Sequence, residues 1–258
     1  MPPAAATTAT SVQPIALVDV DCRLDPAMLA AVAEAVSIAS QRDFADPKWG
    51  YRCASSITVR PSLAAVLPTE RAALLLRTPD APGALGYHDE SRSIKVFPLI
   101  DDIANLGVTL SHEIFERDAD ENCQTCIIGP DGKIRLAEPG DPVEDVRFGY
   151  DVTVQSGAKI RVSDFVGKDY FAGAEPGKAG HFDFCGHVKR PGQVLAGGYQ
   201  TMYSRGKYTQ VTRGRKRHYR EALDALVANG AHQHRTARAM VSVPRIVDRH
   251  GQLVEGTW

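Results

Sequence analysis

The residues with the clearest chemical potential lie between Ser111 and Asp120. His112, Glu116 and Asp120 follow one another at intervals of four residues, which places them along one face of a helix with 3.6 residues per turn. A neutral imidazole and a carboxylate one turn apart can hold a divalent ion, as the two histidines of a His-Glu-x-x-His helix do. Glu116 stands here in place of the second histidine. The spacing therefore predicts a helix that binds a metal ion.

Glu113 lies next to His112 in the sequence and about 100° around the helix from it. The general base of the His-Glu-x-x-His motif occupies this position and takes a proton from water whose pKa the ion has lowered. We therefore predict Glu113 as the catalytic base, with Ile114 and Phe115 packed into the core. The alternative interpretation is a charged, solvated helix face, because acidic residues at helical spacing are common on exposed helices.

The metal-site helix is expected over residues 106–118, after an alternation of strands and one earlier helix. Asp25 and Pro26 predict the start of that earlier helix, which continues to about residue 40. Gly83 and Gly86 predict a loop, and the order of elements favours an α+β domain of two layers. Strands are expected at 15–20, 55–60, 72–77, 94–98, 151–154 and 159–162.

The metal-helix segment resembles a family of uncharacterised zincin-like proteins of bacteria and bacteriophages, with the pattern Ser-His-Glu-x-x-Glu-x-x-x-Asp-Pro. Residues 111–113, Glu116 and Asp120 match this pattern, whereas Glu121 stands where the family has proline. The resemblance spans residues 15–200 and implies a zincin-like, metallopeptidase-like domain with a small mixed sheet, an N-terminal helix and a metal-site helix. Other matching segments follow in the family's order at 41–44, 49–50, 86–90, 138–144, 162–166, 170–171 and 197–200.

An ion held by His112 and Glu116 needs at least one further protein ligand. The candidates are Asp120, one turn further along the helix, and Glu138 and Asp141 from an acidic turn. The alternative is that Asp141 is an ordinary turn residue and that Glu138 is exposed. Zinc is the first choice of metal, and a set so rich in carboxylates also suits calcium or manganese.

The five cysteines form an odd number, which does not suit a disulfide-stapled secreted scaffold. Cys123 and Cys126 form a Cys-x-x-Cys pair, and Cys185 and His187 form a Cys-x-His pair. Together these four residues could make a structural zinc site or a thiol cluster, and ordinary reduced cysteines are the alternative. His88 lies in a loop bounded by glycines and could face the site, and an exposed or structural histidine is the alternative.

Charge is distributed unevenly along the chain of 258 residues, although its 30 Lys and Arg nearly balance its 31 Asp and Glu. Residues 101–150 carry twelve acidic and four basic side chains, whereas residues 201–258 carry eleven basic and four acidic ones. The basic tract could dock on other subunits of a larger assembly, contact nucleic acid or remain solvated. Its densest part, ahead of a helix expected at 221–228, is Arg213, Arg215, Lys216, Arg217 and Arg220.

The sequence divides into an extended arm at 1–14, the α+β domain at 15–200 and a basic C-terminal extension at 201–258. No apolar run reaches the roughly 18 residues that a membrane span needs, and the N-terminus does not resemble a signal peptide. We therefore expect a protein of the bacterial cytoplasm or of a bacteriophage virion. Two functions stay open: a metal-dependent hydrolase, acting on peptide bonds, and a non-catalytic component of a bacteriophage head, neck or tail.

Overall fold

The computed structural model describes residues 10–79, 85–88, 93–98, 104–213 and 244–254, and its first sheet has five strands in the order β2-β1-β3-β5-β4. β1 runs parallel to β2 and β3, and β3 runs parallel to β5. The edge strand β4 runs antiparallel to β5. The bounds are β1 (Ser11–Asp19), β2 (Cys53–Arg60), β3 (Arg71–Leu75), β4 (Gly86–His88) and β5 (Ile94–Val96).

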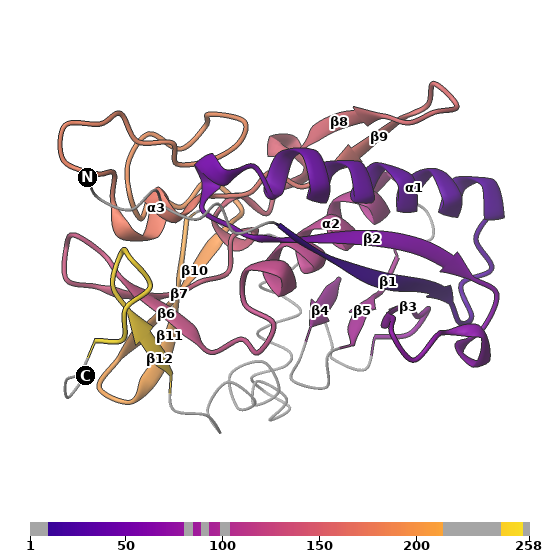
Figure 1. The fold of residues 1–258 in the computed structure, drawn as a ribbon, viewed down its shortest axis with the longest axis horizontal. Helices are drawn as coiled ribbons and strands as arrows, with labels where there is room; N and C mark the ends of the chain where they lie inside the picture. Colours follow the sequence, from indigo (N-terminus) through magenta and orange to yellow (C-terminus); the bar gives the residue numbers. More distant parts are fainter. Residues whose placement is uncertain (1–9, 80–84, 89–92, 99–103, 214–243, 255–258) are drawn as a thin grey trace, which may run out of the picture.

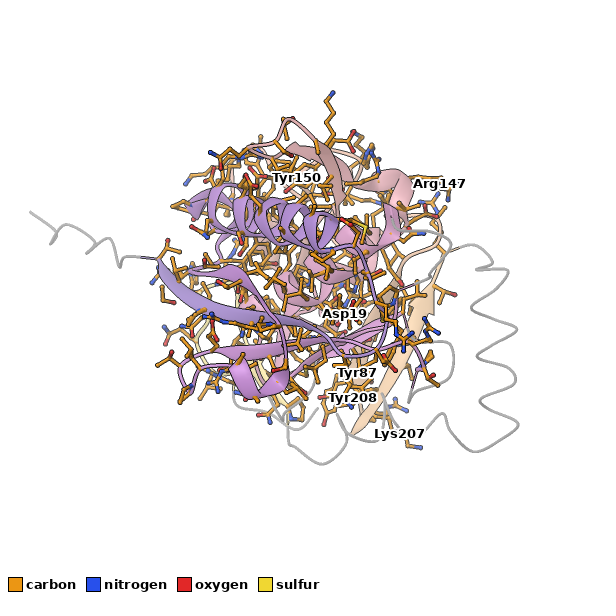
Figure 2. All side chains as sticks on the ribbon, turned by 90° about the vertical axis from the view of Figure 1, so that its right-hand side faces the viewer. Asp19, Tyr87, Arg147, Tyr150, Lys207 and Tyr208 are labelled. Atoms are coloured by element: carbon orange, nitrogen blue, oxygen red, sulfur yellow. The ribbon has the colours of Figure 1, made fainter. Side chains whose placement is uncertain are left out.

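Two helices, α1 (Pro26–Ile38) and α2 (Ala104–Ala119), pack against each other and against this sheet (Figure 1). α1 starts as the sequence predicts, because Asp25 Oδ1 accepts a hydrogen bond of 2.9 Å from the backbone N–H of Met28. The hairpin of β8 (Tyr150–Thr153) and β9 (Lys159–Val162) contacts both helices. Figure 2 shows α1 between Tyr150 of this hairpin and Asp19 of β1, so the helices lie between the hairpin and the sheet.

A second sheet of five strands has the order β11-β10-β7-β6-β12 and lies beside the short helix α3 (Lys168–Ala172) (Figure 1). Its neighbouring strands are antiparallel, except that β12 runs parallel to β6. β6 directly follows α2 along the chain, so the second sheet fixes the segment that leaves this helix. The bounds are β6 (Thr125–Ile128), β7 (Ile134–Leu136), β10 (Tyr199–Ser204), β11 (Lys207–Thr212) and β12 (Arg245–Val247).

The α+β class is confirmed, and every strand and helix expected within the described residues is present. Three features differ from the expectations. β1 begins at Ser11, so the end of the expected extended arm pairs with β2. The expected loop around Gly86 contains the edge strand β4, which is too short for a recognisable pattern. β10 and β11 extend the second sheet to Thr212, beyond the expected boundary at residue 200.

The basic tract is described only at its first residue. Arg213 is exposed, and its backbone carbonyl accepts a hydrogen bond of 3.0 Å from the N–H of Gly197. Arg215, Lys216, Arg217, Arg220 and the helix expected at 221–228 lie outside the described residues. Within the described part of the chain, no helix has both the length and the apolar composition that crossing a membrane requires.

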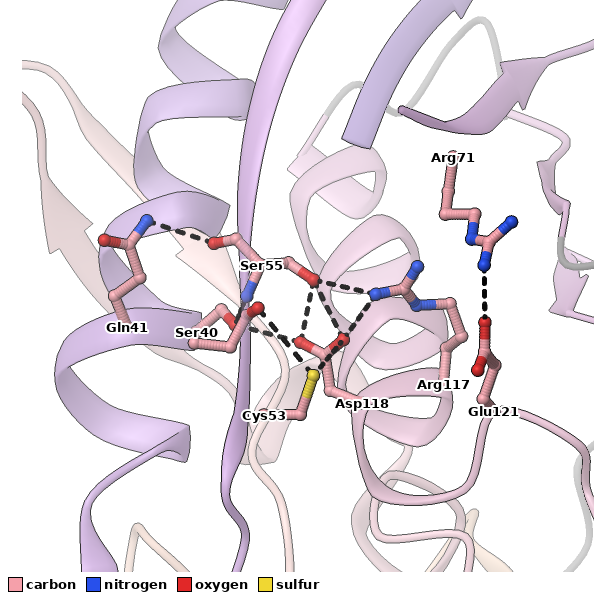
Figure 3. Close-up of polar contacts among 9 residues, drawn as sticks. Ser40, Gln41, Cys53, Ser55, Arg71, Arg117, Asp118 and Glu121 are labelled. Atoms are coloured by element: carbon pink, nitrogen blue, oxygen red, sulfur yellow. Dashed lines mark hydrogen bonds and ion pairs between the residues drawn. The ribbon is translucent and has the colours of Figure 1, made fainter. Parts of the chain in front are cut away.

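A buried ion pair fixes the C-terminal half of α2 (Figure 3). Asp118, whose side chain has no exposed surface, accepts hydrogen bonds of 2.8 Å from Arg117 Nη2, 2.8 Å from Ser55 Oγ and 3.1 Å from Ser40 Oγ. Burial raises the pKa of Asp118 above its ordinary value, although Arg117 and the two serines oppose the rise. Because Ser55 belongs to β2 and Ser40 to the π-helical turn after α1, these bonds set the rotation of α2 about its axis.

We expect Asp118→Ala to lower the free energy of unfolding by about 3–5 kcal/mol, because it leaves the charge of Arg117 buried without its partner. Urea unfolding followed by circular dichroism measures this change. Arg147→Ala is the control, since Arg147 is 67 % exposed in its ion pair with Asp145 and should contribute less than about 1 kcal/mol. Equal small losses in both variants would contradict the role given to Asp118.

Candidate metal centre

The middle of α2 is buried on all sides. Every residue from 110 to 118 is buried, including His112, Glu113 and Glu116. The alternative of a solvated acidic face is therefore wrong, whereas Ile114 and Phe115 lie in the core as predicted. Burying a charge costs free energy unless the charge is paired or bound to a metal ion. Each charged side chain of this helix therefore needs a partner.

His112, Glu116 and Asp141 converge as one group. His112 Nε2 lies 3.1 Å from Glu116 Oε1 and 3.5 Å from Asp141 Oδ1. One candidate ligand atom from each of the three residues lies within 4.8 Å of the others. Asp141 begins the short 3-10 helix Asp141–Val143, so the turn after β7 faces α2 at this point. The structure thus brings together three of the predicted metal ligands.

The carboxylates of this group have too few hydrogen-bond donors. Glu116 Oε1 and both carboxylate oxygens of Asp141 are buried, and no donor among the described residues reaches them in hydrogen-bond geometry. Burial and the charge of Glu116 raise the pKa of Asp141 to about 6. Burial lowers the pKa of His112, but Glu116 and Asp141 outweigh it and raise this pKa well above its ordinary value. The group therefore needs positive charge, which bound protons or a divalent ion can supply.

Gly140 sets the position of the His112 ring. A Cβ atom at residue 140 would lie 2.5 Å from His112 Nδ1 and 2.8 Å from its Cε1. Only glycine therefore lets the backbone of this turn lie against the imidazole. The ring is held with Nε2 toward the two carboxylates, the orientation in which it can act as a ligand.

His88 forms a second group with two residues of α2. Its side chain is 4 % exposed, and Nδ1 lies 3.4 Å from Glu113 Oε2 and 3.9 Å from Glu116 Oε2. His88 thus faces the candidate site and is not exposed, because the antiparallel edge strand β4 brings it over the helix. Gly86, two residues earlier, faces the same helix, and a Cβ atom there would lie 2.9 Å from Glu113 Oε1. One feature of the sequence points to this arrangement. Gly86 and His88 are two residues apart, the spacing at which residues of a strand face the same side.

Cys123 lies on the other side of His88, with Sγ 3.0 Å from Nε2. Burial is the main cause that raises the pKa of Cys123 above its ordinary value. Burial lowers the pKa of His88, but Cys123, Glu113 and Glu116 outweigh it and raise this pKa well above its ordinary value. Cys123 and Glu113 thus contact the two ring nitrogens of His88 and hold the ring toward the predicted base.

Two further predicted ligands lie outside the group of three. Asp120 Oδ2 accepts a hydrogen bond of 2.5 Å from Thr125 N, and its Oδ1 accepts one of 3.1 Å from Thr125 Oγ1. Asp120 therefore holds the turn between α2 and β6 and does not join His112. Glu138 is half-buried and lies beside Asp141 without belonging to the ligand group.

The structure does not bring the four residues of the predicted cysteine–histidine zinc site into one group. Cys123 contacts His88, whereas Cys126 points into an apolar cluster of the second sheet because it alternates with Thr125 along β6. Cys185 and His187 lie together elsewhere, near Asp164. All five cysteines are free thiols.

No protein-family model, no curated protein and no solved structure matches the chain. Its function therefore has to be inferred from the chemistry of these side chains.

We expect Gly140→Ala to weaken zinc binding at His112 by about 10–100-fold, because the added methyl group displaces the ring from the two carboxylates. Isothermal titration of the metal-free protein with zinc measures the affinity. Gly157→Ala is the control: Gly157 has φ +84° at the tip of the β8–β9 hairpin with no atom near its Cβ position. It should cost about 1 kcal/mol of stability and leave zinc affinity unchanged. Unaltered affinity in Gly140→Ala would contradict the assigned ligand geometry.

Proposed function

We propose that the chain has a zincin-like domain that binds a divalent ion through His112, Glu116 and Asp141 and acts as a metal-dependent hydrolase. The observation that carries the proposal is a set of three buried carboxylate oxygens without hydrogen-bond donors, which lie next to His112. An imidazole with two carboxylates fits zinc, and the high carboxylate content also suits manganese or calcium.

Glu113 is the general base in this proposal. An ion at the three ligands would supply Lewis acidity and lower the pKa of a nearby water. Glu113 accepts the proton of that water, and the adjacent Nδ1 of His88, 3.4 Å from Oε2, orients the carboxylate. Gly86 leaves room for the other carboxylate oxygen. The resemblance to metallopeptidase-like proteins makes peptide bonds the favoured substrate.

A second function is favoured by the burial of the centre. His112 is 5 %, Glu116 3 % and Asp141 1 % exposed, which suits an ion that stabilises the fold as well as one that meets a substrate. In this alternative the protein is a non-catalytic component of a bacteriophage particle. Its basic C-terminal extension would dock on neighbouring subunits or on nucleic acid, and its location would be the virion rather than the bacterial cytoplasm.

We expect zinc to stabilise the metal-free protein by about 2.7 kcal/mol when free zinc is one hundred times the dissociation constant. Urea unfolding with and without zinc measures the difference. His112→Ala and Asp141→Asn should each remove the part of the stabilisation that comes from this centre, because each removes a ligand. Asp120→Asn is the matched control and should retain it, since Asp120 is engaged by Thr125. Equal stabilisation of the wild type and His112→Ala would exclude the metal centre.

We expect Glu113→Gln to keep its zinc but to hydrolyse a library of quenched fluorescent peptides about 10²–10⁴-fold more slowly than the wild type. Glu121→Gln changes an acidic residue just beyond α2 that pairs with Arg71, and it should retain full activity. Full activity in Glu113→Gln would contradict its role as base. A zinc-loaded wild type that cleaves none of the peptides would contradict the hydrolase proposal and favour the structural alternative.

A further inference from the structure

The segment between α3 and β10, residues 173–198, contains no helix and no strand other than one isolated bridge. Loops of this length without secondary structure are uncommon in compact domains unless something holds them in place. This one pairs briefly with residues 165–167. Phe184 N donates to Phe165 O at 3.0 Å, and Gly167 N donates to Phe182 O at 3.0 Å.

The side chain of Asp183 shapes the loop just after this pairing. Its two carboxylate oxygens accept hydrogen bonds of 2.7 Å from His187 N and 2.9 Å from Val188 N. Asp164 Oδ1 accepts a bond of 3.2 Å from Cys185 N. These bonds fold the loop so that Cys185 and His187 both face Asp164.

Asp164, Cys185 and His187 offer three different ligand atoms at one place. One carboxylate oxygen, the thiol sulfur and one ring nitrogen lie within 4.8 Å of one another. Asp164 has no exposed surface, and its Oδ2 is buried without a hydrogen-bond donor among the described residues. His187 is exposed on the solvent side, where its ring lies 5.2 Å from that of Phe148. The buried, unsatisfied carboxylate oxygen of Asp164 therefore lies close to Cys185 and His187, which are partly or fully accessible to solvent.

Binding of a metal ion by these side chains needs a carboxylate from Asp164, a thiolate from Cys185 and a neutral imidazole from His187. Protons that these groups carry leave to solvent when the ion binds, so its affinity falls as the pH is lowered.

We propose that Asp164, Cys185 and His187 form a second metal site, which binds zinc and fastens the loop 173–198 to the segment that follows β9. A thiolate and an imidazole select zinc over calcium or magnesium. Ligand atoms around tetrahedral zinc lie about 3.5 Å apart, so the present cluster needs only small side-chain movements to close. The site shares no residue with the His112 centre and does not depend on the function proposed for that centre.

Cobalt substitution in the full-length chain tests this site, because a cysteine ligand gives cobalt a thiolate charge-transfer band in the near ultraviolet. We expect this band in the wild type and in His112→Ala, and we expect Cys185→Ser to lose it. His187→Gln should weaken cobalt binding at least tenfold, whereas His181→Gln, which changes another exposed histidine of the same loop, should not. Circular dichroism verifies that each variant is folded.

Cys123→Ser tests whether the band comes from the cysteine near the His112 centre, since Cys123 lies beside His88. It should keep the charge-transfer band if Cys185 is the ligand. The proposal is overturned if the wild type shows no band, if Cys185→Ser keeps it, or if Cys123→Ser loses it. Elemental analysis gives an independent count: Cys185→Ser should contain one zinc ion fewer per chain than the wild type.

Discussion

The candidate site depends on one constraint: the middle of α2 is buried on all sides although it carries several ionisable residues. Asp118 is matched by Arg117 and two serines, and Glu113 is matched by His88. Glu116 shares His112 with a second buried carboxylate, Asp141, and its other neighbour, His88, lies closer to Glu113. The carboxylates of Glu113 and Asp118 are thus matched, and the shortage of positive charge falls at Glu116 and Asp141. An ion at that point would remove this shortage.

The same constraint explains the arrangement of the elements around the helix. The sheet and α1 cover one part of α2, and the hairpin of β8 and β9 covers another. Two glycines allow close approach where the centre needs it: Gly86 beside Glu113 and Gly140 beside His112. The second sheet continues directly from α2, and the turn after its strand β7 contributes Asp141. The candidate ligands thus come from two parts of the chain that the fold brings to one helix.

The local part of the centre could be predicted from the sequence. His112 and Glu116 lie one turn apart in any helix, so their proximity did not depend on the tertiary fold. Asp120 has the same spacing, but α2 ends at Ala119, and Asp120 became a turn residue bonded to Thr125. The position of His88 stayed open in the sequence, because it depends on the antiparallel pairing of a strand only three residues long.

In the fold, too, local patterns could be predicted from the sequence, whereas features that depend on pairing between distant segments could not. The apolar, β-branched runs of the first sheet and the Asp25-Pro26 helix start were recognisable, whereas β10 and β11 were not. β11 alternates little, with exposed side chains at all but one of its six positions, so it is formed by its pairing with β10 and not by a local apolar pattern. The cysteines were grouped by motif, but Cys123 lies in the turn before β6 and contacts His88, whereas Cys126 lies in β6 and faces an apolar cluster.

The most direct test of the metal centre is a crystal structure of the zinc-soaked protein with data collected at the zinc absorption edge. We predict an anomalous peak about 2 Å from His112 Nε2 and from one oxygen each of Glu116 and Asp141. Zinc bound elsewhere with no peak at this position would contradict the metal centre, as would a protonated His112 that donates hydrogen bonds to both carboxylates.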